Sequence, residues 1–313
     1  MAEVKKVATR DSYGNALKEL GETHANLVVL DADLAGATKT AIFKKAFPER
    51  HFDCGIAEAN MVNVAAGLST MGFVPFAATF AMFAAGRAYE QVRNTVGYPH
   101  LNVKIGATHG GISVGEDGAS HQCCEDFALM RTIPGMTVMC PSDDVEARKM
   151  VKAAYEMEGP VYMRFGRAAT PVFHDEDYDF RIGKGEVIQD GTDVAIIATG
   201  IMVPEAIEAG KALAEAGISA RVINMATIKP LDEELVLKAA KDCGKIVTVE
   251  EHSIIGGLGE AVCGLLAEQC PTPVRRIGVN DEFGHSGPAG ALLKQFGLCA
   301  DHIVEVARDF VGK

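Results

Sequence analysis

Residues 10–33, RDSYGNALKELGETHANLVVLDAD, contain the pattern that decides the fold. The large apolar side chains of Arg10–Thr23 recur at helical spacing, so we expect a helix there. The continuous apolar run Leu27–Leu30 is typical of a strand that helices cover on both faces. This strand ends at Asp31 and Asp33, and ligands of open α/β sheets bind beyond such carboxyl ends. The stretch therefore predicts an α/β protein with a functional site at one edge of its sheet.

The same alternation of helical and strand patterns continues along the chain, which predicts two doubly wound α/β domains with mostly parallel sheets. The charged run His174–Gly185 lacks an apolar period and is the best candidate for a linker. We expect a first domain at 1–175, a linker at 176–190 and a smaller α/β domain at 191–313. Helices are expected at 60–71, 80–96, 145–157, 204–216, 233–240, 256–269 and from 286 onward, and strands at 73–76, 103–105, 136–139, 161–164, 194–198, 220–223, 246–249 and 274–277.

The composition excludes several classes of protein. The chain has 313 residues, 48% of them hydrophobic, which is enough for about two globular domains. Its 30 Lys and Arg against 42 Asp and Glu leave no basic surface for nucleic acid. The N-terminus has no apolar signal segment, and polar residues interrupt the apolar stretch Met61–Gly86, so no membrane association is expected. Eight cysteines without a C-x-x-C pair indicate a reducing compartment, the cytoplasm.

The loop Gly106–Gln122, GATHGGISVGEDGASHQ, is the most promising functional segment. It holds His109, Asp117 and His121 among five glycines, whose backbone can approach a ligand closely. Each histidine alone could satisfy the local backbone, but together with Asp117 they suit a polyhydroxylated substrate. Glu58 precedes an apolar helix, where it is either a first-turn carboxylate stabilised by the helix dipole or a buried acid with a functional partner.

Other candidate residues leave two interpretations open. Phe80 and Phe83 lie three residues apart on an expected helix face, as ordinary core or as an aromatic platform for a ring. Arg10, Arg164 and Arg167 are either solvated charges or part of the cluster that an anionic substrate needs. A tight turn at Glu250–His252 is favoured over a weak anion site, and the His121–Cys124 segment lacks a second ligand pair at zinc spacing, so no metal site is expected in the chain.

Four motifs carry a family resemblance: DADL at Asp31–Leu34, GIAEANM at Gly55–Met61, TFAMF at Thr79–Phe83, and the segment from Thr108 to Gln122 with its GEDGASHQ. On these motifs the chain resembles, essentially from end to end, the C-terminal half of transketolase. The resemblance implies thiamine diphosphate as the cofactor. It also implies transfer of a two-carbon ketol unit from a ketose phosphate to an aldose phosphate.

The resemblance also implies roles for individual cofactor-site residues. Glu58 matches the catalytic glutamate that protonates the aminopyrimidine ring, which helps the cofactor's own amino group to deprotonate the thiazolium carbon. A carboxyl in apolar surroundings is suited to sharing a proton with a ring nitrogen. Phe80 matches the aromatic residue that stacks on the pyrimidine, with Phe83 beside it. Asp33 and Leu34 fall at cofactor-binding positions.

At the substrate positions, the resemblance implies that Arg10, His109 and Arg164 face the phosphate. Asp117 and His121 would face the sugar hydroxyls, and His121 would also be catalytic. Some positions depart from the family pattern and leave the particular sugars open: Ala37 replaces a phosphate-facing Ser, Ala57 and Ala59 replace an Arg and a His, and Gly86 replaces a third pocket aromatic.

The sequence contains no G-D-G motif, through which the family anchors the cofactor's diphosphate by a metal. We therefore predict a separate N-terminal transketolase subunit that supplies the ligands for the diphosphate and for Mg²⁺ or Ca²⁺. The expected assembly is α2β2, with self-association through the C-terminal half. One alternative is a 1-deoxyxylulose-5-phosphate synthase-like protein, although such proteins normally carry their cofactor domain in the same chain. Another is a 2-oxoacid dehydrogenase beta-type subunit, although those lack the GEDG-x-x-H loop. The third is a non-catalytic regulatory subunit of the same fold.

Overall fold

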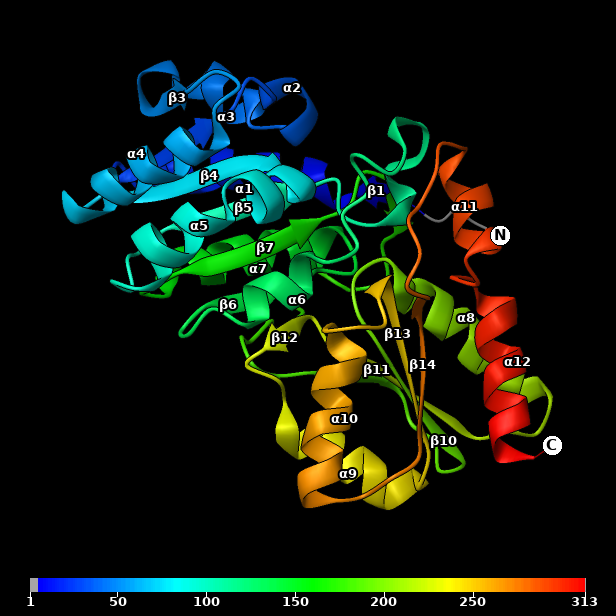
Figure 1. The fold of residues 1–313 in the computed structure, drawn as a ribbon. Helices are drawn as coiled ribbons and strands as arrows, with labels where there is room; N and C mark the ends of the chain where they lie inside the picture. Colours follow the sequence, from blue (N-terminus) through cyan, green and yellow to red (C-terminus); the bar gives the residue numbers. More distant parts are fainter. Residues whose placement is uncertain (1–4, 313) are drawn as a thin grey trace.

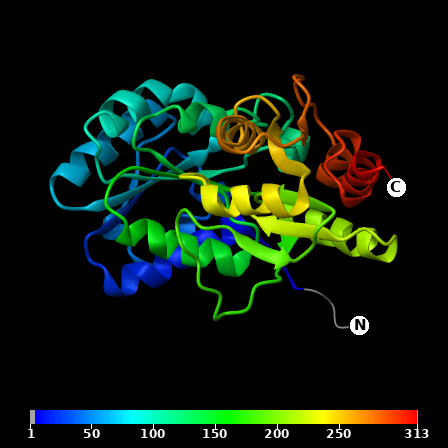
Figure 2. The same ribbon diagram turned by 90° about the horizontal axis from the view of Figure 1, so that it is seen from below.

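The computed structural model describes residues 5–312, which form two α/β units at opposite ends of the molecule (Figure 1). Residues 1–4, which are part of the N-terminal stretch predicted to lack a signal segment, and Lys313 lie outside the described residues. Seen from below, the helices of the first unit and the C-terminal helix again lie at opposite ends (Figure 2). The predicted α/β class with two sheets is confirmed.

The first unit is built on a seven-stranded sheet that is parallel except at one edge. Its spatial order is β12 (Thr227–Lys229), β6 (Thr137–Met139), β7 (Val161–Phe165), β5 (Lys104–Thr108), β4 (Val74–Phe80), β2 (Leu27–Asp31) and β3 (His51–Asp53). The antiparallel edge strand is β12. A separate two-stranded sheet pairs β1 (Lys6–Ala8) with β8 (Ala169–Pro171).

Helices cover both faces of this sheet, because successive residues of a buried strand point to opposite sides. Val28 and Leu30 of β2 belong to one core cluster, while Leu27 and Val29 belong to another. The first cluster packs under α4 (Glu58–Thr70), the π-helical turns η2 (Phe83–Arg87) and η3 (Val92–Gly97) with α5 (Tyr89–Gln91) between them, and α6 (Asp126–Arg131). The other packs under α1 (Thr9–Thr23), α3 (Ala41–Ala46) and α7 (Asp144–Glu156); the short α2 (Ala35–Thr38) and the 3-10 turn η1 (Pro48–Arg50) complete the unit.

The second unit has a five-stranded sheet that is also parallel except at one edge. Its order is β14 (Val274–Val279), β13 (Ile246–Ser253), β10 (Val194–Ala198), β11 (Ala220–Asn224) and the antiparallel β9 (Glu186–Gln189). Apolar clusters on its two faces involve α8 (Met202–Glu215), α11 (Ala289–Gln295) and α12 (Ala300–Val311) on one side and α9 (Glu233–Cys243) and α10 (Leu258–Gln269) on the other.

Four local predictions differ from the structure. The tight turn favoured at Glu250–His252 is wrong, because β13 continues through these residues to Ser253. The helix predicted over 80–96 is wrong at its start, because β4 continues to Phe80 as seven buried residues, and the rest is broken into π-helical and α-helical turns. The loop predicted over 106–122 begins inside β5 and contains the 3-10 segment η4 (Ile112–Asp117). The segment 176–190 predicted as a linker contains β9, which pairs with β11 of the second unit.

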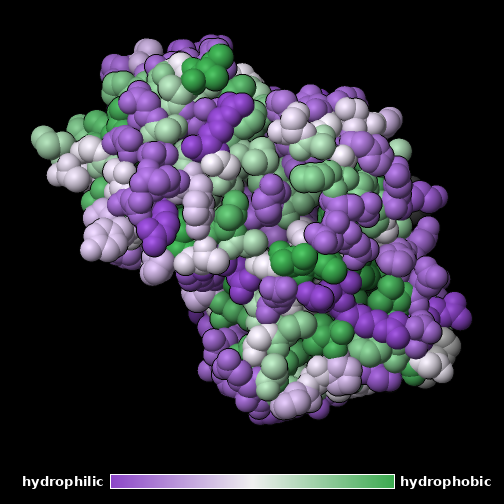
Figure 3. All heavy atoms as spheres, in the orientation of Figure 1, coloured by the Kyte–Doolittle hydropathy of each residue, from purple (hydrophilic) through white to green (hydrophobic). Residues whose placement is uncertain are grey.

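The two units are joined by more than the linker. Strand β12 follows a strand of the second sheet in sequence, yet it pairs with β6 of the first sheet. On the face drawn in Figure 3, apolar residues gather around the waist between the units. Among residues 5–312, every helix is too short or too polar to cross a membrane.

Candidate active site

The aromatic and histidine side chains predicted for the site come together at the carboxyl ends of β4 and β5. Phe80 is the last residue of β4 and lies opposite Thr108, the last residue of β5, so His109 emerges beside it. The rings of Phe80 and His109 stack with centroids 3.8 Å apart. Phe83 stacks on Phe80 at 5.6 Å, and His121 meets Phe83 edge-on at 5.5 Å. The platform arises from a strand end, and not from one helix face as predicted.

Glu58 lies at the start of α4 and is 4% exposed, so both features expected of it, first-turn position and burial, are present. Its Oε1 lies 3.2 Å from Nη1 of Arg87. The Arg87 guanidinium also lies over the Phe83 ring, 4.1 Å from its centroid. Arg87 therefore connects the carboxylate to the aromatic pair. Arg87 was not among the predicted site residues, although its position four residues after Phe83 within one helical segment is the local signal for this contact.

His109 is held as a neutral ring with a defined tautomer. A guanidinium can only donate, so Nη1 of Arg10, 3.0 Å away, donates to Nε2 of His109. The proton of the ring then lies on Nδ1, which donates to Oγ1 of Thr108 at 2.8 Å. Burial, and next the charge of Arg10, lower the pKa of His109 to about 3. The ring therefore carries no charge at neutral pH.

Positive side chains surround His109 on a protein whose net charge is −12. Arg10 also donates to the carbonyl of Ala37 at 3.2 Å. Arg167 donates to the carbonyl of Val114, lies 3.3 Å from the exposed Glu116 carboxylate and 3.8 Å from Asp117, and contributes to the lowered pKa of His109. These groups make a locally cationic edge that suits an anionic substrate.

Arg164 does not belong to this group, and the expectation that it faces the substrate phosphate is corrected. It is 3% exposed, on β7, and its guanidinium donates to the carbonyls of Cys123 and Glu251 at 2.8 Å each. Nε lies 3.4 Å from the buried Asp126 carboxylate. The guanidinium is thus bound inside the junction between the two units, while Arg167, two residues beyond the end of β7, reaches the candidate site.

The DADL motif forms the turn that follows β2. Asp33 adopts a left-handed φ of 60°, and its N–H donates to the Asp53 carboxylate at 3.0 Å. The N–H of Leu34 donates to the buried Asp31 carboxylate, which also accepts the hydroxyls of Thr38 and Thr40 at 2.8 Å each. Burial raises the pKa of Asp31. Asp31 thus fixes the turn, and the exposed Asp33 side chain is left at the sheet edge.

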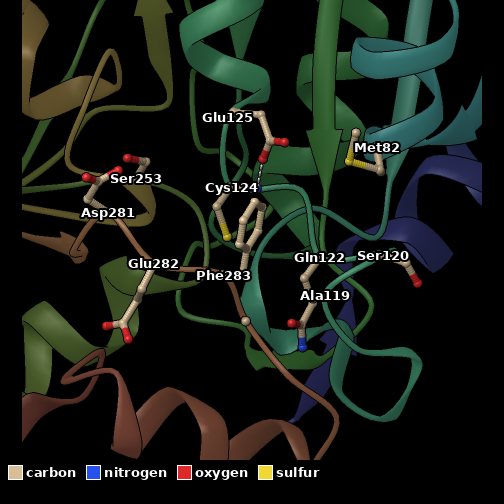
Figure 4. Close-up of a pocket in the computed structure, with 11 residues that line it drawn as sticks. Met82, Ala119, Ser120, Gln122, Cys124, Glu125, Ser253, Asp281, Glu282 and Phe283 are labelled. Carbon is tan, nitrogen blue, oxygen red and sulfur yellow. Dashed lines mark hydrogen bonds between the residues drawn. The ribbon is translucent and has the colours of Figure 1, made fainter.

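A cavity of about 440 Å³ adjoins the aromatic platform (Figure 4). It lies between the two units, next to the chain neighbours of Phe83 and His121. The second wall of the cavity was not predicted, and the helix start expected near residue 286 is the one sequence signal close to it. The residues on the first wall are Met82, Ala119, Ser120, Gln122, Cys124 and Glu125, and those on the second are Ser253, Asp281, Glu282, Phe283 and Gly284.

Across the described range 5–312, no group of three or more His, Cys, Asp or Glu side chains is placed to hold a metal ion. The groups that do converge are a carboxylate, flat aromatic rings, a neutral imidazole and guanidinium groups. Such a set can stack on a heteroaromatic ring, exchange a proton with it and bind an anion.

Comparisons with known proteins agree with this fold. Models of the transketolase pyrimidine binding domain and the transketolase C-terminal domain match residues 5–172 and 183–303. A protein of Methanocaldococcus jannaschii named "Putative transketolase C-terminal section" is 54% identical over 95% of this chain and 94% of its own. Human transketolase is 38% identical over 98% of this chain, which spans 50% of that protein.

A solved structure described as "Split gene transketolase, inactive beta4 tetramer" has 53% identity and a TM-score of 0.92, covering 98% of this chain and 99% of that one. Together, these matches place the chain among the thiamine-diphosphate enzymes. It belongs to the transketolase family, of which it comprises the pyrimidine-binding and C-terminal domains.

Proposed function

We propose that the chain is the C-terminal subunit of a split transketolase. With an N-terminal subunit, it would transfer a two-carbon ketol unit from a ketose phosphate to an aldose phosphate. The observation that carries this proposal is the convergence of Glu58 and the Phe80–Phe83 pair with the cationic edge around His109. A heteroaromatic cofactor needs the carboxylate and the aromatic rings, and a phosphorylated sugar that reacts with it needs the cationic edge beside them.

The residues fit the pyrimidine half of thiamine diphosphate. When bound, this cofactor supplies an acidic thiazolium carbon that can become a nucleophile. Phe80 and Phe83 would stack on the pyrimidine ring, and Asp33 and Leu34 would border it. Glu58 would hold a proton toward a ring nitrogen, and Arg87, now on both Glu58 and Phe83, would keep the carboxylate paired until the ring takes its place.

The cationic edge would bind the phosphate of the sugar. Arg10 and Arg167 would donate to it, and we assign Arg167 the place predicted for Arg164. His109 would join them once the phosphate brings a negative charge, because that charge favours a second proton, on Nε2. Asp117 and His121, on the same loop, would contact the sugar hydroxyls, with His121 also near the reacting carbons.

The surface beside Glu58 supports a partner subunit at this site. Glu58 is the one charged residue of α4, whose solvent side is otherwise uncharged. Ile56 and Met71, before and after α4, are each 76% exposed, and Val64 is 38% exposed. The exposed polar residues of α4, Asn60, Asn63 and Thr70, are neutral, and it is charged residues that are depleted from the core of protein interfaces. The N-terminal subunit would cover this face and hold the diphosphate with its Mg²⁺ or Ca²⁺, in an α2β2 assembly joined through the C-terminal half.

The test is an assay of ketol transfer with thiamine diphosphate, Mg²⁺ and phosphorylated sugars. The chain alone should be inactive, and a mixture with the N-terminal subunit of a split transketolase should be active. The variant Glu58→Gln should remove the activity of the mixture, whereas Glu22→Gln, on the exposed surface of α1, should not. Turnover by the isolated chain would contradict the split site, and an inactive mixture would contradict the proposed activity.

A further inference from the structure

The loop that carries His109, Asp117 and His121 is fastened at both ends to β13 of the second unit. It has little regular structure of its own. In this loop, His109 has a φ of 59°. Three of the loop's glycines have φ between 74° and 83°: Gly111, Gly115 and Gly118. Such a backbone has many alternative conformations, so its shape has to be fixed by neighbours.

Glu251 of β13 fastens the beginning of the loop. Its carboxylate Oε1 accepts the backbone N–H of Ser113, 138 positions away in the sequence. The contact is tight, because a Cβ on Gly111 would lie 2.3 Å from Cδ of Glu251. Only glycine combines that clearance with the left-handed φ of 82° found there.

The end of the loop is fastened to the same strand. The carbonyl of Glu251 accepts Nη1 of Arg164, whose Nη2 donates to the carbonyl of Cys123. Two residues along β13, the N–H of Ser253 donates to the carbonyl of Cys124 at 2.7 Å. The N–H of Gly111 donates to Cys123 at 2.8 Å and closes the loop on itself. Strand β13 therefore sets the distance between the two ends.

Burying the Glu251 carboxylate in β13 costs folding free energy. Glu251 is 5% exposed, and burial raises its pKa to about 6, while Arg164 and the Ser113 N–H hold it down. A buried carboxylate is tolerated where it gains such partners. Its neighbour Glu250 points elsewhere and accepts the N–H groups of Leu258 and Gly259 at the start of α10. Of these two buried carboxylates, Glu251 serves the site loop and Glu250 the fold of its own unit.

We propose that Glu251 is a positioning residue that holds the site loop in its substrate-binding shape, and that this is a task of the C-terminal domain in catalysis. The proposal rests on the proposed function for its catalytic meaning. We call the hydrogen bond from the Ser113 N–H to the Glu251 carboxylate the latch. Its effect on the loop is a property of the chain that can be measured without turnover.

The experiment compares Glu251→Met with Glu250→Met, which changes an equally buried carboxylate one residue away. Amide hydrogen exchange is measured on the full chain. Glu251→Met should raise exchange across residues 109–122 about tenfold or more, because the Ser113 amide loses its acceptor. Glu250→Met should leave 109–122 unchanged and raise exchange at 258–261. Glu251→Gln keeps an acceptor oxygen and should restore most of the protection.

The same variants are then assayed with the N-terminal subunit. Glu251→Met should raise KM for the phosphorylated sugar about tenfold and leave the Kd of thiamine diphosphate unchanged. Equal exchange of 109–122 in both Met variants would overturn the latch, as would a uniform rise across the whole chain. If Glu251→Met does not fold, Glu251→Ala, which also removes the acceptor oxygen, takes its place, and unchanged exchange at Ser113 in that variant would overturn the proposal. An inactive wild-type mixture would contradict the proposed function alone, because the exchange result stands separately.

Discussion

Two polar clusters lie near the carboxyl ends of the strands in the first unit, and they differ in how their partners are supplied. The interior cluster, around Arg164, Asp126 and Glu251, is bound within the chain by the Arg164–Asp126 ion pair of the first unit and by a hydrogen bond from Arg164 to the Glu251 carbonyl of the second. The open cluster, around Glu58 and Arg87, lies at the surface, and the Arg87 side chain is 56% exposed. The chain completes the first cluster and leaves room for other molecules at the second.

Arg164 and Arg167 show this difference within one segment. They are three residues apart and have the same side chain, yet Arg164 fixes the junction and Arg167 belongs to the cationic edge. The position of the strand end, after Phe165, separates them. The chemical type of a residue therefore does not assign its role; the partners that the fold supplies do.

The largest effect is expected in the open cluster at Glu58. Replacing it with Gln should lower kcat of the two-subunit complex about 1000-fold, because the amide cannot hold the proton for the cofactor ring. The thermal midpoint should change little, since Gln keeps the shape. Steady-state kinetics and circular dichroism measure both. A variant with kcat near that of the wild type would remove Glu58 from its proposed role.

The arginine pair gives the next effect. Arg164→Met should lower the free energy of unfolding by about 3–5 kcal/mol, because it leaves the buried Asp126 carboxylate without its charged partner and only with the Tyr162 hydroxyl. The matched Arg167→Met should cost less than about 1 kcal/mol, because that side chain is partly exposed. Urea unfolding of the chain alone measures both. Equal losses of stability would contradict the division into an interior and an open cluster.

A second closed network, at the start of the linker, gives a pH-dependent effect. Burial would lower the pKa of His174, but Asp143 and Glu186 outweigh it and raise the pKa from 6.5 to about 9. The folded state therefore binds this proton more tightly than the unfolded state. Its stabilisation, roughly 3 kcal/mol at most, is complete below pH 6.5 and is lost as the pH rises through 9.

The difference in unfolding free energy between wild type and His174→Gln should accordingly be largest near pH 6 and shrink toward pH 9.5. Using the difference cancels other groups, such as the buried Lys104, whose pKa burial lowers to about 7 and whose effect has the opposite sign. A difference that grows with pH would show that His174 is not held protonated.

The smallest effect is expected at Arg10. Arg10→Met should raise KM for phosphorylated sugars about tenfold with kcat changed little, the pattern of lost ground-state binding. His109 should also gain a proton more easily, because a neighbouring positive charge is removed. Steady-state kinetics with a phosphorylated and a non-phosphorylated sugar measure the first effect, and an equal change for both sugars would contradict phosphate contact.

Local patterns were sufficient to predict much of the fold. The helix α1 and strand β2 follow from their spacing, and α11 begins at Ala289, directly after Pro288, near the predicted position. Pairing between distant segments was not predictable, because β12 is a short strand that takes its partner from the other unit. The helix predicted to start at Phe80 is wrong at that end. The apolar residues of β4 continue to Phe80, and their pattern does not distinguish the end of a buried strand from the start of a helix.

The site was predicted in part for the same reason. The motifs singled out Glu58, Phe80, His109 and His121, and the register of β4 and β5 places Phe80 beside His109. Arg87 and Glu251 were not found as site residues, because their partners lie 29 and 138 positions away. Roles that depend on such long-range contacts cannot be read from spacing alone.

The proposal that the chain holds only the pyrimidine half of the cofactor site is tested most directly by calorimetry. Thiamine diphosphate with Mg²⁺ is titrated into the chain alone, into the N-terminal subunit alone and into their equimolar mixture. We predict one cofactor bound per pair of subunits in the mixture, at least about 100-fold tighter than in the isolated chain. Binding to the isolated chain as tight as to the mixture would contradict a shared site.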